Sequence, residues 1–329
     1  MKHLKKLFLA IILSFGVVFS ASFKTEVAYA DNYVYLSGEV CGFSLVSEGV
    51  TVIGLSDVIT KDKTYSPAKE AGIKTGDLII NINNNKVNSD TDIDNLIQKP
   101  NVIIEVKRGS EYLTFVFKPA LDINGKYKLG IFVRNDITGI GTVTFYKEDG
   151  GFSALGHEIY SDNSQKLDIV GGNAYKCGIS KIVKGVKGDP GEIQGYLKKS
   201  ELVGNIKNSK NCGIYGTKDN FETSNYKKIS VLESKKVSIG KASIYTNISG
   251  EYLEYEVSII KIDSLDNDKN YVLRITDENL LNFTGGIIQG MSGTPLLQNG
   301  NIIGAITHVF VNDPTMGYGI SIDNLLSNF

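Results

Sequence analysis

Short apolar runs, each bounded by glycine, asparagine or aspartate, are the feature that most constrains this chain. They dominate from Leu121 onward, as in GIFVRNDITGIGTVTFYK, GGFSALGHEIY and NIIGAITHVFV. Val, Ile, Phe and Tyr favour strands, and runs of this length between turn residues are typical of antiparallel sheets. The chain also has 35 glycines and shows no internal repeat in this region. The sequence therefore predicts a mainly β protein, with a barrel or double-barrel domain over residues 121–329.

Composition and charge narrow the function classes. With 42% hydrophobic and 22% charged residues in 329, the chain is predicted to fold into about two globular domains. Its formal net charge is -1 and its pI is about 6.3. Nucleic-acid binding requires a concentrated basic face, so the sequence argues against that class of partner.

The first 30 residues have the three parts of an export signal. A basic start, an apolar run over residues 7–19 and the sequence Ala28-Tyr29-Ala30 follow one another. We expect residues 1–30 to be a signal peptide and the protein to work outside the cytoplasm. An uncleaved signal anchor is the alternative, although the apolar run is short for a membrane span.

Cysteine and histidine are scarce. Cys41, Cys177 and Cys212 lack metal-type spacing. We expect free thiols, with a Cys177–Cys212 bridge as the alternative. Because His3 lies in the signal, the exported chain has two histidines, His157 and His308. No metal site and no cofactor are predicted.

One segment of the N-terminal half resembles the PDZ family. The sequence SPAKEAGIKTGDLIININNNKV is similar to the central signature of these domains, and we expect a PDZ domain over residues 31–120. Ser66-Pro67 predicts a short capped helix that stops at Gly72, and Gly109-Ser110 predicts a hairpin turn. By position, the resemblance implies a carboxylate-binding loop formed by Gly42, Phe43, Ser44 and Leu45.

Two short segments carry the residues of a serine nucleophile and its base. In GMSGTP, Ser292 stands between glycines, and the N–H groups of Gly290 and Ser292 are placed to stabilise an oxyanion. A serine hydroxyl needs a base to take its proton, and histidine is the usual one. His157 in SALGHEI is the expected base, and His308 is the second choice.

GMSGTP resembles the nucleophile loop of chymotrypsin-like serine peptidases, and residues 31–329 together resemble the SpoIVB (stage IV sporulation protein B) family. GIGTVTFY, SALGHEI, KGVKGDPGEIQG and the last 45 residues carry the second resemblance. It implies a chymotrypsin-like double β-barrel following the PDZ domain, with Ser292 as nucleophile and His157 as base. It also places the acid at Asp277. Asp162, Asp168 or a bare Ser/His dyad remain open.

The same resemblance implies a biological role. Members are exported serine endopeptidases of sporulation that cleave themselves and a regulator of a membrane-embedded protease, which activates sigma-K. They act in the space between the forespore and mother-cell membranes. The PDZ domain is expected to hold a peptide terminus, including the chain's own apolar end LLSNF. The competing interpretations are a non-catalytic PDZ scaffold and an HtrA-like quality-control protease.

Overall fold

The computed structural model describes residues 33–160, 166–263, 266 and 269–329. The expected signal peptide, residues 1–30, and the candidate acid Asp162 lie outside these ranges. Within them, no helix has both the length and the apolar character needed to cross a membrane. All three cysteines, Cys41, Cys177 and Cys212, are free thiols, as expected, and no Cys177–Cys212 bridge is formed.

Six antiparallel strands form the first barrel. β10 pairs with β11 on one side and β1 on the other, and the remaining neighbours complete a closed ring in the order β1-β12-β13-β14-β11-β10. The strands are β1 (Tyr33–Leu55), β10 (Ile131–Tyr146), β11 (Gly151–Ala154), β12 (Ile169–Val183), β13 (Glu192–Lys210) and β14 (Gly213–Thr217). A short strand, β15 (Lys227–Ser230), pairs with the start of β1, and the turns η1 (Thr223–Asn225) and η2 (Ser234–Lys236) flank it.

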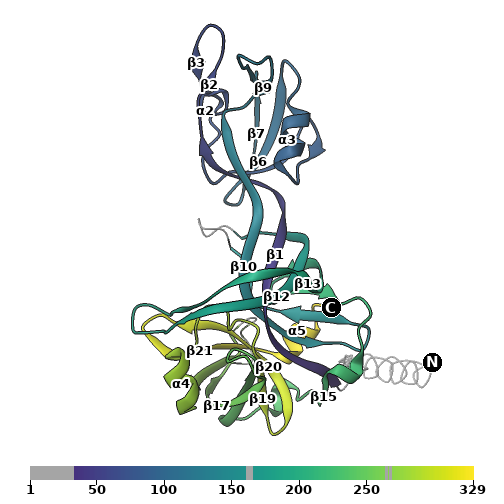
Figure 1. The fold of residues 1–329 in the computed structure, drawn as a ribbon, viewed down its shortest axis with the longest axis vertical. Helices are drawn as coiled ribbons and strands as arrows, with labels where there is room; N and C mark the ends of the chain where they lie inside the picture. Colours follow the sequence, from purple (N-terminus) through teal and green to yellow (C-terminus); the bar gives the residue numbers. More distant parts are fainter. Residues whose placement is uncertain (1–32, 161–165, 264–265, 267–268) are drawn as a thin grey trace, which may run out of the picture. The chain divides into compact units, whose positions relative to one another are not determined.

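A second closed barrel follows, drawn in green to yellow in Figure 1. Its order is β16-β17-β18-β21-β20-β19. These strands are β16 (Gly240–Thr246), β17 (Leu253–Ile262), β18 (Tyr271–Ile275), β19 (Pro295–Gln298), β20 (Asn301–Phe310) and β21 (Asp313–Ser321). Helix α4 (Glu278–Thr284) lies between β18 and β19, and α5 (Ile322–Leu326) ends the chain. The predicted double β-barrel is confirmed.

The PDZ part has its own apolar core, built by its small sheet and two helices. Its elements are β2 (Val58–Ile59), β3 (Thr64–Tyr65), α2 (Pro67–Ala71), β4 (Leu78–Ile82), β5 (Asn85–Lys86), α3 (Asp90–Leu96), β6 (Val102–Arg108), β7 (Glu111–Phe117), β8 (Ala120–Leu121) and β9 (Tyr127–Lys128). The hydroxyl of Ser66 caps α2, and Gly72 ends it with φ 96°. A two-residue turn at Gly109-Ser110 joins β6 to β7. Both local predictions are confirmed.

β1 and β10 are shared between the two parts. They pair in antiparallel fashion from Tyr35/Tyr146 to Leu55/Ile131, and Figure 1 shows them side by side. β1 also pairs with β4 of the PDZ sheet through Val50 and Thr51. The PDZ elements are therefore inserted between the first and second strands of the first barrel, rather than placed ahead of it.

This insertion corrects two predictions. The first part of β1, up to Ser47, pairs with β10 and β12 of the first barrel, so the division at residues 31 and 120 does not separate the two folds. The expected carboxylate-binding loop, Gly42, Phe43, Ser44 and Leu45, lies in that part of the strand. Phe43 and Leu45 are buried in the first barrel's core. These four residues are part of a barrel strand and not of a peptide-binding loop.

Candidate active site

The loop that carries Ser292 connects α4 to β19 and is held by a strand of the other barrel. On β10, the amide of Thr142 donates to the carbonyl of Ser292 at 2.9 Å, and its hydroxyl donates to the carbonyl of Gly290 at 3.1 Å. The hydroxyl of Thr144 donates to the carbonyl of Gly293 at 2.8 Å. Both threonines are fully buried. The nucleophile loop is thus fixed before any substrate arrives.

Two residues explain how the sequence of the nucleophile loop allows it to pack against both barrels. Gly293 has φ 92°, and a Cβ there would overlap the carbonyl oxygen of Thr142. The side chain of Met291 is fully buried in the core of the second barrel. The glycine therefore allows close approach to the first barrel, while the methionine anchors the loop in the second.

The two N–H groups predicted for the oxyanion hole are unused. Met291 donates its N–H to the carbonyl of Ile288 at 3.1 Å, and that of Gly293 is also hydrogen-bonded. In the part of the chain that the structure describes, neither the N–H group of Gly290 nor that of Ser292 donates to an acceptor. Donors that are fixed but unpaired can stabilise developing negative charge without reorganisation.

His157 comes from the first barrel and reaches the same place as Ser292. After β11, Leu155 (φ 70°) and Gly156 (φ 74°) turn the chain. A left-handed leucine is strained, and such strain concentrates at functional sites. A Cβ at Gly156 would lie 3.2 Å from the Thr307 methyl group, and the Thr307 carbonyl accepts the Ser292 hydroxyl at 2.7 Å. The histidine and serine segments therefore meet at Thr307.

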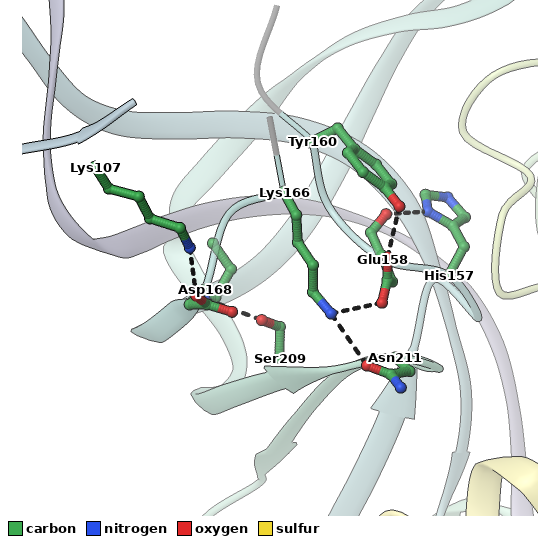
Figure 2. A network of polar contacts seen from close by, with 9 residues as sticks. Lys107, His157, Glu158, Tyr160, Lys166, Asp168, Ser209 and Asn211 are labelled. Carbon is green, nitrogen blue, oxygen red and sulfur yellow. Dashed lines mark hydrogen bonds and ion pairs between the residues drawn. The ribbon is translucent and has the colours of Figure 1, made fainter. Parts of the chain in front are cut away.

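The main chain determines which nitrogen of His157 can act as a base. Its Nδ1 lies 2.6 Å from the carbonyl oxygen of Glu158, which can only accept a hydrogen bond (Figure 2). Nδ1 therefore carries the proton, and Nε2 keeps its lone pair. Burial lowers the pKa of His157 below 6.5, although the bond to Glu158 opposes the shift. The imidazole is thus neutral at pH 7, as a base must be.

His308 is a close neighbour of His157, with ring centroids 4.8 Å apart. Its Nδ1 is buried and, among the residues that the structure describes, has no hydrogen-bond partner. Burial, with a smaller effect from His157, lowers the pKa of His308 to about 4. Because no hydrogen bond orients that nitrogen, the geometry favours His157 over His308 as the base.

Asp277 is the N-cap of α4. Its Oδ1 accepts from the N–H of Leu280 at 3.0 Å, and its Oδ2 accepts from the N–H of Glu256 at 3.3 Å. The structure thus joins Ser292 and His157 at one site but forms no hydrogen bond between Asp277 and His157. A catalytic role for Asp277 stays a prediction.

Two other acids near His157 in sequence, both among the described residues, are also engaged elsewhere (Figure 2). Asp168 pairs with Lys107 at 3.4 Å. The carboxylate of Glu158 accepts from Tyr160 and from Lys166, each at 2.5 Å. These contacts leave the carbonyl of Glu158 as the group that orients His157. A main-chain role of this kind has no sequence signal.

The PDZ part contains a groove of about 470 Å³ between α3 and the start of β10. Lys128, Leu129 and Gly130, which directly precede β10, line this groove, whereas the predicted residues 42–45 do not. The sequence analysis missed this loop, although a glycine between apolar residues just before a strand was a usable signal.

The C-terminus lies on the first barrel. The ring of Phe329 contacts the rings of Tyr215 and Phe145, with centroids 5.1 and 5.8 Å apart, and Lys147 lies over it. The expectation that the PDZ groove holds the chain's own end is therefore not met in this structure.

Comparisons with known proteins agree with this architecture. The PDZ family model matches residues 58–108. A protein of Clostridium perfringens named "Putative zinc metalloprotease" is 38% identical over 69 residues, covering 20% of this chain and 21% of that protein. The chain thus spans about a fifth of this relative's length.

Two solved structures are also similar. The PDZ domain of the SdrC-like protein from Listeria monocytogenes has 28% identity and a TM-score of 0.21, covering 26% of this chain and 87% of its own. The HtrA-type protease AlgW with a decapeptide has 12% identity and a TM-score of 0.31. The match covers 63% of this chain and 56% of the AlgW chain.

The family model described as SpoIVB peptidase S55 matches residues 125–326, more than half of the chain. The matched range contains both His157 and Ser292. The chain belongs to the SpoIVB peptidase S55 family and contains a PDZ domain.

Proposed function

We propose that Ser292 is the nucleophile of this endopeptidase and His157 its general base. The observation that carries the proposal is the meeting of the two segments at Thr307, one from each barrel, beside two unpaired N–H groups. In the resting structure the Ser292 hydroxyl donates to the Thr307 carbonyl. Rotation about χ1 of Ser292 would release it toward Nε2 of His157.

The reaction then proceeds by acyl transfer. His157 accepts the proton as the Ser292 oxygen attacks the peptide carbonyl, and the N–H groups of Gly290 and Ser292 stabilise the oxyanion. His157 next protonates the leaving amine, and water releases the acyl group. The carbonyl of Glu158 supports this sequence because it accepts from Nδ1 and stabilises the imidazolium that forms.

We further propose the biological role that the family suggests. The protein would be exported into the space between the forespore and mother-cell membranes, with its N-terminus as a transient anchor. There it would cleave itself and a regulator of an intramembrane protease, and so trigger sigma-K activation. Family membership supports this role, and the PDZ groove supports capture of a peptide or protein terminus.

The direct test is self-cleavage of the purified chain. Wild type, Ser292→Ala and His157→Ala are incubated in parallel, and their cleavage sites are mapped by mass spectrometry. Cleavage in wild type alone supports the proposal. Equal cleavage in wild type and Ser292→Ala would refute the assignment of the nucleophile.

A further inference from the structure

The groove beside α3 has an open strand edge. The N–H of Ser56 donates to the carbonyl of Gly130 at 2.9 Å, next to the opposed pair Leu55 and Ile131. In an antiparallel ladder this makes Leu55/Ile131 a pair without mutual hydrogen bonds, so the polar backbone groups of Ile131 point away from β1. Among the described strands, β10 pairs only with β1 and β11, and β11 reaches only residues 143–146. The edge at Ile131 can therefore accept an added strand.

The end of this edge can receive a carboxylate. Leu129 and Gly130 use their carbonyls to bind Ala68 and Ser56, but their N–H groups donate to no acceptor in the described ranges. Two successive unpaired N–H groups form an anion-binding concavity. A peptide whose C-terminal carboxylate lies here would run antiparallel to β10.

Two contacts give the direction of α3 relative to β10. Just before β10 begins, Lys128 Nζ pairs with Asp94 Oδ1 at 3.1 Å. Farther along β10, the side chain of Asn135 donates to the carbonyl of Asn88 at 3.0 Å, just before α3 begins. The helix is therefore antiparallel to β10, with its end beside the carboxylate position and its first residue, Asp90, farther up the groove.

Aliphatic and acidic side chains line different stretches of the groove along β10 and α3. Aliphatic residues line the groove beside the start of β10 and the end of α3, namely Ile93, Ile97, Leu129 and Ile131. Four carboxylates, Asp57, Asp90, Asp94 and Asp122, face a single cation, Lys128. Asp94 is paired with that lysine, and the carboxylate of Asp122 binds turn N–H groups. Among the described residues, Asp90 accepts hydrogen bonds from its neighbour Thr91 alone, so its charge is available to a ligand.

From this placement we propose that the groove selects protein C-termini that end in a large aliphatic residue and carry Lys or Arg two residues before it. The last side chain covers the aliphatic floor. In an extended peptide, the residue two positions earlier lies on the same side and comes next to the first turn of α3. There a cation meets Asp90. The proposal rests on terminus capture by the PDZ groove and adds its charge selectivity.

The test uses the full chain carrying Ser292→Ala, which prevents cleavage of the probes. Fluorescein-labelled octapeptides ending in Lys-Ala-Leu, Glu-Ala-Leu and Lys-Ala-Leu-amide are titrated by fluorescence anisotropy. An exposed ion pair contributes modestly to affinity, and replacing one partner with the opposite charge turns the attraction into repulsion. We expect the Lys peptide to bind about three- to tenfold more tightly than the Glu peptide, and the amide to bind at least tenfold more weakly than its free acid.

Asp90→Asn should reduce the Lys-over-Glu preference to less than about twofold, while Asp62→Asn, a matched change outside the groove, should keep it. Melting curves establish that each variant is folded. Equal affinity for the Lys and Glu peptides would overturn the charge selectivity while terminus capture stands. If no free-acid peptide binds, terminus capture itself fails. Neither result bears on self-cleavage by wild type, which tests the catalytic assignment separately.

Discussion

The two ends of β10 show how one strand serves two purposes. At Ile131 the side of its backbone that faces the groove pairs with no described strand, and within the described ranges the N–H groups of its neighbours Leu129 and Gly130 are unpaired. At Thr142 and Thr144 the same strand is buried, and it holds the nucleophile loop through three hydrogen bonds. A surface that must accept a changing ligand keeps its polar groups free. A loop that must be ready for chemistry has them satisfied, except for the two donors that we propose stabilise the oxyanion.

The largest effect short of removing the reacting groups is expected at Gly290. Its φ of 100° strains any other residue, and a Cβ would lie 2.8 Å from Ile193 Cδ1. Gly290→Ala should displace one oxyanion donor and lower kcat about 10²- to 10³-fold with a smaller change in KM. Steady-state kinetics on a peptide substrate measures this. Gly188→Ala is the control, because that glycine also has positive φ (91°) but open space around its Cβ position. An unchanged kcat in Gly290→Ala would place the oxyanion elsewhere.

A smaller effect is expected where the two barrels join. Thr142→Val keeps the shape but leaves the buried carbonyl of Gly290 without its donor, at a cost of about 1 to 3 kcal/mol. We expect kcat to fall about tenfold, and Thr142→Ser, which restores the hydroxyl, to recover most of it. If the Val and Ser variants have equal kcat, the Thr142 hydroxyl does not position the nucleophile loop. The buried end of β10 would then have no role in catalysis through this hydrogen bond.

Acid should weaken both rate and stability through the paired histidines. The pKa of His157 lies below 6.5, so kcat/KM should stay level to below pH 6.5 and fall as His157 takes up a proton. The pKa of His308 is about 4 in the folded chain and near 6.5 when unfolded. Between these values the unfolded state binds more protons, so stability falls as pH decreases from 6.5 toward 4. Over this pH range the melting temperature should drop less in His308→Asn than in wild type. An equal drop in both would contradict the assignment of this pH dependence to His308.

The smallest effect on activity is expected at Asp277. Asparagine caps helices as well as aspartate does, so Asp277→Asn should keep activity within about threefold. Asp277→Ala should lower the free energy of unfolding by about 1 kcal/mol, as measured by urea denaturation. A loss of activity of 10³-fold in the Asn variant would show that the carboxylate acts on His157 in another conformation and would restore a three-residue site.

Local signals allowed the sequence to predict much of this. Ser66-Pro67 with Gly72 fixes a short helix through neighbouring contacts. Likewise, the glycines around Ser292 reflect the backbone conformation that the loop needs.

Long-range pairing explains what the sequence could not predict. Gly42–Leu45 has the composition of a binding loop, but two strands distant in sequence, β10 and β12, decide that it belongs to a barrel. The contribution of Glu158 is a carbonyl that every residue has, and Thr142 acts across 150 residues on the carbonyl of Ser292. Asp277 has the strong local signal of an N-cap, and the structure contains that cap.

The pairing of Ser292 with His157 across the two barrels is the central claim, and covalent labelling tests it most directly. The purified chain is treated with a fluorophosphonate probe, and the modified residue is identified by peptide mass spectrometry. The account predicts modification of Ser292, none in Ser292→Ala, and a labelling rate at least about 10³-fold lower in His157→Ala. Labelling of another residue, or an unchanged rate in folded His157→Ala, would contradict it.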